Sequence, residues 1–366
     1  MKPRVVLLRG HSANPWDLRP WELLRDRFDV RVLVTGSNAF ELTGLTLPVE
    51  HVGAVRDRLP RGRHGDLAAL VIGDRYLGLE EKLRGADVVH AAEIGVPYSH
   101  GPAQLRDRLG FRLVLTVWET IPFGEAYRRF RGKRQRRETI PLVDLFLPAT
   151  ERARRMLLLE GAQAERCEVA PPGIDTARFS ATDPPSTHLV LSAGRLVWEK
   201  GHQDVLRAVA WLRREGHEVR ALVVGAGPEQ RTLHAHARDL GIEHAVAWRE
   251  SVPYHEMPAV FASASCFVLA SLPTKVWEEQ FGMVLAEAAA SGLPIVASSS
   301  GAIPEVLGSH GRLFPPGDWH ALGRALLPIV SAPPARVSYG DLVERYSVEA
   351  AAGRYAAAYE RVLSSA

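Results

Sequence analysis

Short apolar runs alternate with longer amphipathic stretches along the first half of this chain. The runs are rich in Val and Leu, which is typical of parallel strands that are buried on both faces. Strands that alternate with helices predict an open parallel sheet of an α/β protein. The expected strands are residues 5–8, 30–34, 88–90, 113–117 and 145–147, and the expected helices are residues 66–83, 104–109, 124–138 and 151–160.

A second α/β segment follows a linker rich in Pro, Ser, Thr and Asp, which covers residues 170–174 and 180–187. Two similar domains are therefore expected, residues 1–173 and 174–344. Ligands of doubly wound sheets bind beyond the carboxyl ends of the strands, so we expect the site in a cleft between two facing sheets. The strands of this half are expected at residues 189–193, 221–224, 266–269 and 295–297, and its helices at residues 203–214, 229–240, 254–262, 283–290 and 321–329.

The composition of the 366-residue chain excludes several classes of protein. It is 46% hydrophobic and 24% charged, which is ordinary for a globular protein with a full core. Its only cysteines, Cys167 and Cys266, provide no disulfide framework and no cysteine metal cluster. The apolar run at residues 5–8 is too short for a signal peptide, and no stretch approaches the ~18 apolar residues of a membrane span. We therefore expect a cytoplasmic protein.

The net charge of +3 is unevenly distributed, because the first half of the chain has an excess of basic residues. Most of that excess lies between Arg128 and Arg137 (RRFRGKRQRR). One interpretation is a solvated helix that is charged on all sides. The other is a surface for anionic lipid headgroups at the inner face of a membrane, or for a phosphate-bearing acceptor. No nucleic-acid-binding motif accompanies the run, so we do not expect a nucleic acid partner.

The segment 278–287 (EEQFGMVLAE) carries the first chemical signal. A helix is expected to begin near Gly282, where unpaired backbone N–H groups and the helix dipole favour an anion such as a diphosphate. Two acids, Glu279 before the helix and Glu287 within it, suit hydroxyl groups on either side of that diphosphate. The alternative is an amphipathic helix with two solvated acids. The expected donor-binding residues here are Glu279, Phe281, Gly282, Met283, Val284 and Glu287.

A second signal is the segment 192–201 (SAGRLVWEKG), which follows an expected strand and precedes an expected helix. It places Gly194, Arg195 and Lys200 on a strand-to-helix loop at the carboxyl edge of the sheet. Guanidinium and ammonium groups there suit phosphate oxygens. The alternative is a surface loop with solvated charges.

Together these segments resemble retaining glycosyltransferase family 4, a large group with the GT-B fold. The resemblance covers nearly the whole second half and includes Gly227 in the turn 224–228 (VGAGP), 267–271 (FVLAS), 290–296 (ASGLPIV), 301–306 (GAIPEV) and 311–317 (GRLFPPG). It implies two Rossmann-like domains, with a C-terminal helix at about residues 345–366 that returns to the first domain. It also implies that Arg195 and Lys200 bind the donor diphosphate, Glu279 the transferred sugar and Glu287 the ribose.

The first half departs from the family pattern at two places. The first loop holds a single glycine, Gly10, where many members have a pair, although Gly10 still permits close approach to the donor. Trp118 and Glu119 stand where many members have a histidine. The candidates for a catalytic residue in this half are therefore Glu119, His90 and Glu93, although a histidine directly after a buried strand more often has a structural role.

The resemblance implies transfer of a sugar from a nucleotide-sugar with retention at the anomeric carbon. Arg195 and Lys200 can replace a cation and no Asp-x-Asp motif stands near their loops, so we expect no metal and no other cofactor. A uridine diphosphate donor is preferred, and the acceptor is a saccharide, a lipid-linked sugar or a small molecule. The alternatives are a sugar-nucleotide epimerase or hydrolase, a phosphorylase that uses pyridoxal phosphate, and a non-catalytic nucleotide-sugar binding protein.

Overall fold

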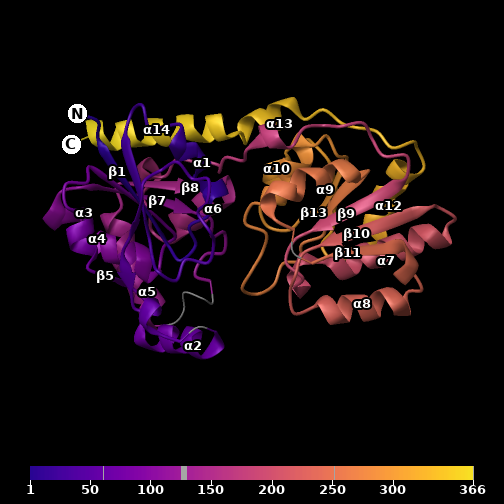
Figure 1. Cartoon of the computed structure of the whole chain (residues 1–366), viewed down its shortest axis with the longest axis horizontal. Helices are drawn as coiled ribbons and strands as arrows, with labels where there is room; N and C mark the ends of the chain where they lie inside the picture. Colours follow the sequence, from indigo (N-terminus) through magenta and orange to yellow (C-terminus); the bar gives the residue numbers. More distant parts are fainter. Residues whose placement is uncertain (61, 125–129, 251, 366) are drawn as a thin grey trace. The chain divides into compact units, whose positions relative to one another are not determined.

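The computed structural model describes residues 1–60, 62–124, 130–250 and 252–365 of the chain (Figure 1). The chain forms two compact units. Unit 1 comprises Met1–Ile174 and Ser347–Ala366, and unit 2 comprises Asp175–Tyr346.

Unit 1 contains a parallel sheet with the order β3-β2-β1-β6-β7-β8. A short antiparallel pair, β4 (Gly53–Ala54) and β5 (Tyr76–Leu77), lies beside it. The strands of the sheet are β1 (Arg4–Gly10), β2 (Asp29–Val34), β3 (Val49–His51), β6 (Val88–Ala92), β7 (Arg112–Val117) and β8 (Leu145–Pro148). The helices are α1 (Pro15–Glu22), α2 (Arg63–Ile72), α3 (Leu79–Leu83), α4 (Pro97–Leu109), α5 (Phe130–Thr139), α6 (Glu151–Leu159) and α14 (Val348–Ser364).

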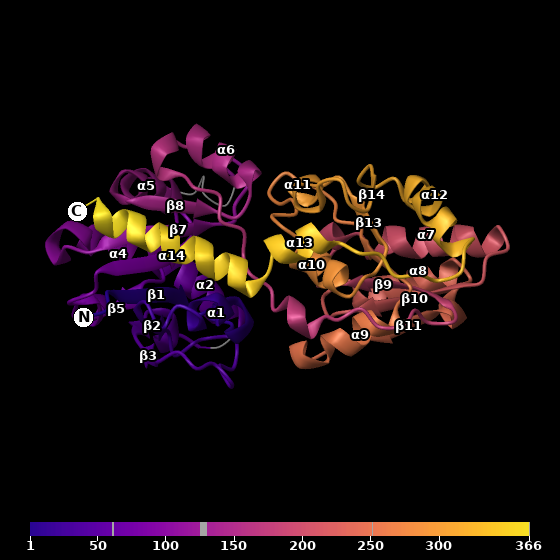
Figure 2. The ribbon, with the colours of Figure 1, turned by 90° about the horizontal axis from the view of Figure 1, so that it is seen from above.

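Helices cover both faces of the unit 1 sheet because successive strand residues point to opposite faces. Val5 and Leu7 of β1 pack with α1 and α14, whereas Val6 and Leu8 pack with α3, α4 and α6. Figure 2 shows α14 crossing the sheet of unit 1. Its tyrosines anchor it, since Tyr355 stacks on Trp21 with ring centroids 4.4 Å apart.

Unit 2 repeats the plan with a parallel sheet in the order β11-β10-β9-β12-β13-β14. Helices α7, α8 and α12 cover one face through a core that includes Val190, Val205 and Leu322. The strands are β9 (His188–Ala193), β10 (Val219–Val224), β11 (Val246–Arg249), β12 (Cys266–Leu269), β13 (Ile295–Ser298) and β14 (Arg312–Phe314). The helices are α7 (His202–Arg214), α8 (Gln230–Asp239), α9 (Met257–Ser263), α10 (Met283–Ala290), α11 (Ile303–Leu307), α12 (Trp319–Val330) and α13 (Gly340–Arg345).

The predicted α/β fold class is confirmed, and every predicted strand is present. Residues 125–129 of the helix predicted at 124–138 lie outside the described residues, and α5 is described from Phe130. Two other predicted helices differ clearly from the structure. The single helix expected at residues 66–83 is divided into α2 and α3, because Gly73 and Gly78 adopt positive φ angles of 88° and 72°. The helix expected at residues 104–109 begins earlier, at Pro97, since a proline is well suited to the first turn of a helix.

Candidate active site

Each sheet has one point at which its strand order reverses, and such points form the crevices that bind ligands in doubly wound proteins. In unit 1 the point lies between β1 and β6, and in unit 2 it lies between β9 and β12. The chain leaves β9 through Gly194 and Arg195 and leaves β12 through Ser271. The predicted strand-to-helix loop therefore stands at the switch point of unit 2.

The switch point of unit 2 joins three of its polar side chains. Lys200 Nζ lies 2.7 Å from Glu279 Oε2 in an ion pair, and the Ser271 hydroxyl donates to the same oxygen at 2.6 Å. Lys200 Nζ also lies 4.8 Å from the centre of the Trp277 ring. The structure thus brings together two residues that the sequence placed 79 positions apart, and adds Ser271 and Trp277 to them.

Arg195 differs from Lys200 in its surroundings. Its side chain is exposed and makes no hydrogen bond or ion pair with any residue that the structure describes. The guanidinium of Arg195 is therefore available to an anion without first breaking a contact.

Close backbone contacts hold the loop of Lys200 in place. Gly201 has φ +68°, and a Cβ there would lie 1.9 Å from the carbonyl oxygen of Ala270. The Leu272 N–H donates to the Glu199 carbonyl at 2.7 Å. A Cβ at Gly227 would lie 2.3 Å from the Leu196 carbonyl oxygen, so this glycine lets the next loop pack against the first. The glycines of the predicted motifs therefore serve close packing between loops.

His202 also holds the loop of Lys200 in place. It was not predicted as a site residue from the sequence. It is 1% exposed, and its Nδ1 lies 2.9 Å from the Ser192 hydroxyl while its Nε2 lies 3.1 Å from the Arg195 carbonyl oxygen. The carbonyl is only an acceptor, so Nε2 carries the proton and Nδ1 accepts from Ser192. Burial lowers the pKa of His202 to about 4.

We expect His202 to make unit 2 less stable as the pH falls below about 6.5, its ordinary pKa. Its pKa is lower in the folded state, so protonation favours the unfolded state between that value and about 4. The free energy of unfolding should fall by up to roughly 1.4 kcal/mol per pH unit in that interval. His202→Gln should remove this part of the slope, whereas the exposed His255→Gln should keep it. Pulse-labelling hydrogen exchange of α7 amides in urea, at pH 7.5, 6.5 and 5.5, measures the slopes, and parallel curves for all three proteins would contradict the assignment.

Helix α10 begins at the predicted place. Gly282 is its N-cap with φ +80°, and Glu287 is its fifth residue. Glu279 and Glu287 are only 6% and 5% exposed, so neither is a solvated surface acid. Glu287 Oε1 accepts from the Tyr254 hydroxyl at 2.9 Å. The turn after β13 anchors Glu279, whose carbonyl accepts from the N–H of Ala302 at 2.8 Å.

The other predicted donor-binding residues of this segment lie at the start of α10. Phe281 is buried and meets the Tyr346 ring edge to face at 5.1 Å, so its side chain belongs to the core. Met283 and Val284 are half-buried in the first turn, where backbone N–H groups lack intrahelical partners. The predicted binding roles of these residues, and of Gly194 and Gly227, stay predictions.

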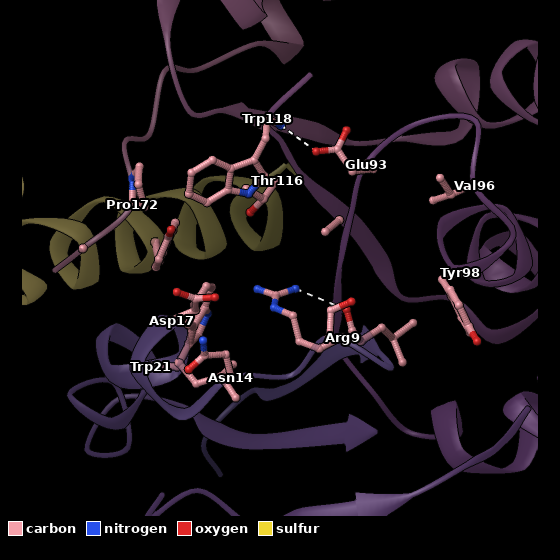
Figure 3. Close-up of a pocket in the computed structure, with 16 residues that line it drawn as sticks. Arg9, Asn14, Asp17, Trp21, Glu93, Val96, Tyr98, Thr116, Trp118 and Pro172 are labelled. Atoms are coloured by element: carbon pink, nitrogen blue, oxygen red, sulfur yellow. Dashed lines mark hydrogen bonds between the residues drawn. The ribbon is translucent and has the colours of Figure 1, made fainter. Parts of the chain in front are cut away.

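A cavity of about 330 Å³ lies at the switch point of unit 1, and we refer to it as the unit 1 pocket (Figure 3). Arg9 from the end of β1 lies at its centre and was not predicted as a site residue. Its Nη1 donates to the carbonyls of Leu8 at 3.2 Å and His90 at 3.4 Å. The lining residues are Leu8, Arg9, Ser12, Asn14, Asp17, Leu18, Trp21, Ala92, Glu93, Val96, Tyr98, Thr116, Trp118, Pro172, Gly173 and Tyr355.

Glu93 lines the unit 1 pocket, whereas Glu119 is not among its lining residues. Glu93 Oε1 accepts from the Trp118 N–H at 2.8 Å, and burial raises its pKa to about 7. Glu119 Oε1 accepts from the N–H groups of Thr120 and Ile121, both at 2.8 Å, and so shapes its own loop. Of these two predicted candidates, the geometry favours Glu93.

His90 lies inside the sheet instead of at its edge. The sequence predicted that the strand ends at residue 90, but β6 continues to Ala92 and leaves His90 with no exposed surface. Its Nδ1 lies 2.6 Å from the Tyr359 hydroxyl and its Nε2 lies 2.7 Å from the Thr116 hydroxyl. Burial also holds its pKa well below the ordinary value. This geometry favours a structural role for His90, linking α14 to the sheet, over the predicted catalytic role.

Gly10 also makes its contacts within unit 1. Its N–H donates to the Tyr76 hydroxyl at 3.0 Å, and a Cβ at this position would lie 3.2 Å from the Tyr98 ring. Its predicted contact with the donor stays a prediction.

Part of the basic run lies outside the described residues, including Arg128 and Arg129. In α5, Arg136 is buried and forms an ion pair with Glu160 at 2.5 Å, while Lys133, Arg134 and Arg137 are exposed. The predicted contact with anionic lipids stays a prediction, and so does the cytoplasmic location. No helix within the described parts of the chain has the length and apolar character needed to cross a bilayer.

Within residues 1–60, 62–124, 130–250 and 252–365, no three His, Cys, Asp or Glu side chains are grouped so that they could hold a metal ion.

Two family models match the chain. "Glycosyl transferases group 1" matches residues 173–344, and "Glycosyltransferase Family 4" matches residues 21–178. The MMP alpha-(1->4)-mannosyltransferase of Mycolicibacterium hassiacum is 30% identical over 321 residues, which cover 84% of this chain and 74% of that protein. A GDP-mannose-dependent alpha-(1-6)-phosphatidylinositol monomannoside mannosyltransferase of Mycolicibacterium smegmatis is 32% identical over 189 residues, 47% of this chain. This second match spans about half of that relative, 49% of its length.

Among solved structures, Anabaena Alr3699/HepE in complex with UDP and glucose is similar with a TM-score of 0.77. The alignment covers 98% of this chain and 100% of that one. At 20% sequence identity this likeness concerns the fold.

Proposed function

This chain belongs to the glycosyl transferases of group 1 and has the GT-B fold, and from that premise we propose that it moves a sugar from a nucleotide-sugar to a saccharide or lipid-linked acceptor. We propose also that the anomeric configuration is retained, and that neither a metal ion nor pyridoxal phosphate takes part. The observation that best supports the proposal is the ion pair between Lys200 and the buried Glu279 at the switch point of unit 2.

The departing nucleoside diphosphate needs stabilisation of negative charge as the glycosidic bond breaks. Arg195 and Lys200 supply two cations, and the first turn of α10 supplies unpaired N–H groups at the positive end of its dipole. Lys200 is held by its ion pair with Glu279 and the N–H groups by α10 itself, so these groups need little reorganisation during the reaction, whereas the exposed Arg195 can turn toward the diphosphate.

The two buried glutamates take different parts of the donor in this proposal. Glu279, which precedes α10, accepts hydrogen bonds from hydroxyls of the transferred sugar. Glu287, within α10 and beside Tyr254, accepts from the ribose hydroxyls. Because Lys200 is paired with Glu279, the phosphate and sugar contacts are coupled through one ion pair.

For the nucleotide, we propose a uridine diphosphate sugar first. GDP-mannose is the second candidate, since the printed name of the Mycolicibacterium smegmatis relative makes that enzyme dependent on it. A thermal-shift panel of nucleoside diphosphates and their sugars separates the two. A ligand at 100 times its dissociation constant should raise the free energy of unfolding by about 2.7 kcal/mol.

We expect the nucleotide-sugar selected by that panel to give a glycoside with the donor's own anomeric configuration. The reaction should proceed in excess chelator, because Arg195 and Lys200 provide the positive charge. Proton NMR of the product in chelator-treated buffer measures both properties at once. Inversion at the anomeric carbon would contradict retention, and activity that returns only with magnesium or manganese would contradict the metal-free proposal. Release of free or epimerised sugar without an acceptor product would contradict transfer itself.

A further inference from the structure

Tyr254 contacts one of the two buried glutamates of the proposed donor site. Its hydroxyl donates to Glu287 Oε1 at 2.9 Å, across 33 positions of the sequence. Tyr254 begins a one-turn helix, Tyr254–Glu256, that leads into α9, whereas Glu287 lies in α10. A carboxylate offers about four acceptor positions, so a donor at one oxygen is compatible with further donors from a ligand. The tyrosine can therefore orient the carboxylate without displacing a ribose from it.

The ring of Tyr254 is fixed by aromatic contacts with the buried core of unit 2. It meets Phe179 edge to face with ring centroids 5.9 Å apart, and Phe179 in turn meets Phe261 of α9 at 5.5 Å. Phe179 and Phe261 are only 1% and 0% exposed, so neither ring can move aside without disturbing the close packing around it. The guanidinium of Arg178 lies 5.8 Å from the centre of the Tyr254 ring and adds a cation–π contact. The position of the hydroxyl is thus set by packing before a ligand binds.

The place of Glu287 on α10 suits the ribose of a bound nucleotide. Met283 and Val284 are in the first turn of α10, where unpaired N–H groups favour a diphosphate. Glu287 follows Met283 by one helical turn, about 6 Å along the axis, and lies on the same face. In a nucleoside diphosphate the 2′- and 3′-hydroxyls lie across the ribose ring from the 5′-phosphate. A diphosphate at the start of α10 therefore directs these hydroxyls toward Glu287.

The orientation of this carboxylate decides how well it selects a hydroxyl. Hydrogen bonds weaken steeply away from linear geometry, so a carboxylate held at one angle favours donors at a fixed position. An analogue without the hydroxyl leaves the buried acceptor unpaired, which lowers its affinity. Glu287 is only 5% exposed, so water has little access to replace the missing donor. A fixed Glu287 can therefore distinguish a ribose from a sugar that lacks its hydroxyls.

We propose that Tyr254 is a positioning residue for Glu287, and that this pair makes unit 2 selective for nucleoside diphosphates with an intact ribose. Nucleotides that lack the ribose hydroxyls are rejected. The inference rests on the proposed function, because it takes Glu287 as the residue that binds the ribose. It extends that function by assigning the donor to the ribonucleotide class and by giving a role to a tyrosine that lies outside both sequence motifs.

The test compares ribonucleotides with their deoxy analogues on the full chain. The probes are UDP, GDP and the 2′,3′-dideoxy form of each, titrated by isothermal calorimetry. The wild-type chain should bind UDP or GDP at least about tenfold more tightly than the matching dideoxy form, because two hydroxyl hydrogen bonds are lost. Tyr254→Phe keeps the ring against Phe179 and removes only the hydroxyl. It should reduce the ratio of the two affinities by about threefold or more, the effect of one net hydrogen bond.

Two further variants separate positioning from a general structural effect. In a chain that carries Glu287→Ala, adding Tyr254→Phe should cause no further change in the ratio, because the two residues act through one contact. Tyr339→Phe is the matched control, since Tyr339 is also in unit 2 and its hydroxyl donates to the Leu293 carbonyl at 2.9 Å. It should leave the affinities and their ratio unchanged.

The outcomes distinguish this inference from the proposed function. A chain that binds neither UDP nor GDP overturns the proposed function and the inference together. A chain that binds one of them but accepts its dideoxy form equally well overturns the ribose role of Glu287 and the proposed selectivity. An unchanged ratio in Tyr254→Phe, whether both affinities fall equally or stay the same, overturns the positioning role of Tyr254 alone.

Discussion

Replacing Arg195 or Lys200 with alanine should weaken binding of the nucleoside diphosphate by about 10- to 150-fold. This range corresponds to about 1.5–3 kcal/mol, the usual value for hydrogen bonds to charged groups. Turnover should fall as well, because the same contacts stabilise the leaving diphosphate. Isothermal calorimetry with the diphosphate and steady-state kinetics with the sugar donor measure the two effects.

The two variants should differ in stability. Arg195 is exposed and its side chain makes no hydrogen bond or ion pair with a described residue, so Arg195→Ala should change the free energy of unfolding by less than about 0.5 kcal/mol. Lys200→Ala leaves the carboxylate of Glu279 buried without its cation, and breaking a buried pair in this way typically costs about 3–5 kcal/mol. The exposed Arg324 on α12 is the matched control, and Arg324→Ala should leave both affinity and stability unchanged. Unchanged diphosphate affinity in both Arg195→Ala and Lys200→Ala would refute the phosphate clamp.

Glutamine substitutions at Glu279 and Glu287 should separate binding of the nucleotide from transfer of the sugar. Glu287→Gln should weaken the free diphosphate and the nucleotide-sugar alike, because the ribose is common to both. Glu279→Gln should lower turnover with the sugar donor by more than tenfold, since the hydroxyl contacts lose their charge assistance. It should not weaken the free diphosphate, because Lys200 loses its ion-pair partner and is left free to meet the phosphates.

Four titrations test these separate roles, because each of the two variants is titrated with the diphosphate and with the nucleotide-sugar. The control for loss of a carboxylate in the same unit is Glu243→Gln, since Glu243 is exposed and lies just after α8. Equal losses in all four titrations, or no loss in any, would mean that α10 does not bind the donor in the proposed orientation.

The central strands could be predicted from the sequence because both of their faces are buried. The runs at residues 5–8 of β1 and 266–269 of β12 contain no polar side chain that would obscure the pattern. The edge strands β3, β11 and β14 were missed, since each is short, partly exposed and carries charged or polar residues (VEH, VAWR, RLF). Helix α1 was missed because Pro15 and Pro20 suggest a loop, although Pro15 occupies the first turn and Asn14 caps it.

The candidate site could be predicted only where its residues lie close together in the sequence. Two local motifs contain the predicted residues, Arg195 with Lys200 in one and Glu279 with Glu287 in the other. The spacing within each motif is what indicates a donor site. The partners of those residues, Ser271 and Tyr254, come from other segments and become visible only through tertiary contacts. His90 was expected at the sheet edge because the expected strand was two residues too short, whereas the longer β6 places its side chain in the interior.

The packing of α14 against β1 imposes an order on biosynthesis. The strands of unit 1 leave the ribosome first, yet Tyr355, Tyr359 and Val362, which cover one face of their sheet, leave it last. All of unit 2, Asp175–Tyr346, is synthesised in between. A nascent chain can therefore complete the core of unit 2 while Val5 and its neighbours are still uncovered apolar surface. During that interval the first half of the chain is the part that would need protection by a chaperone.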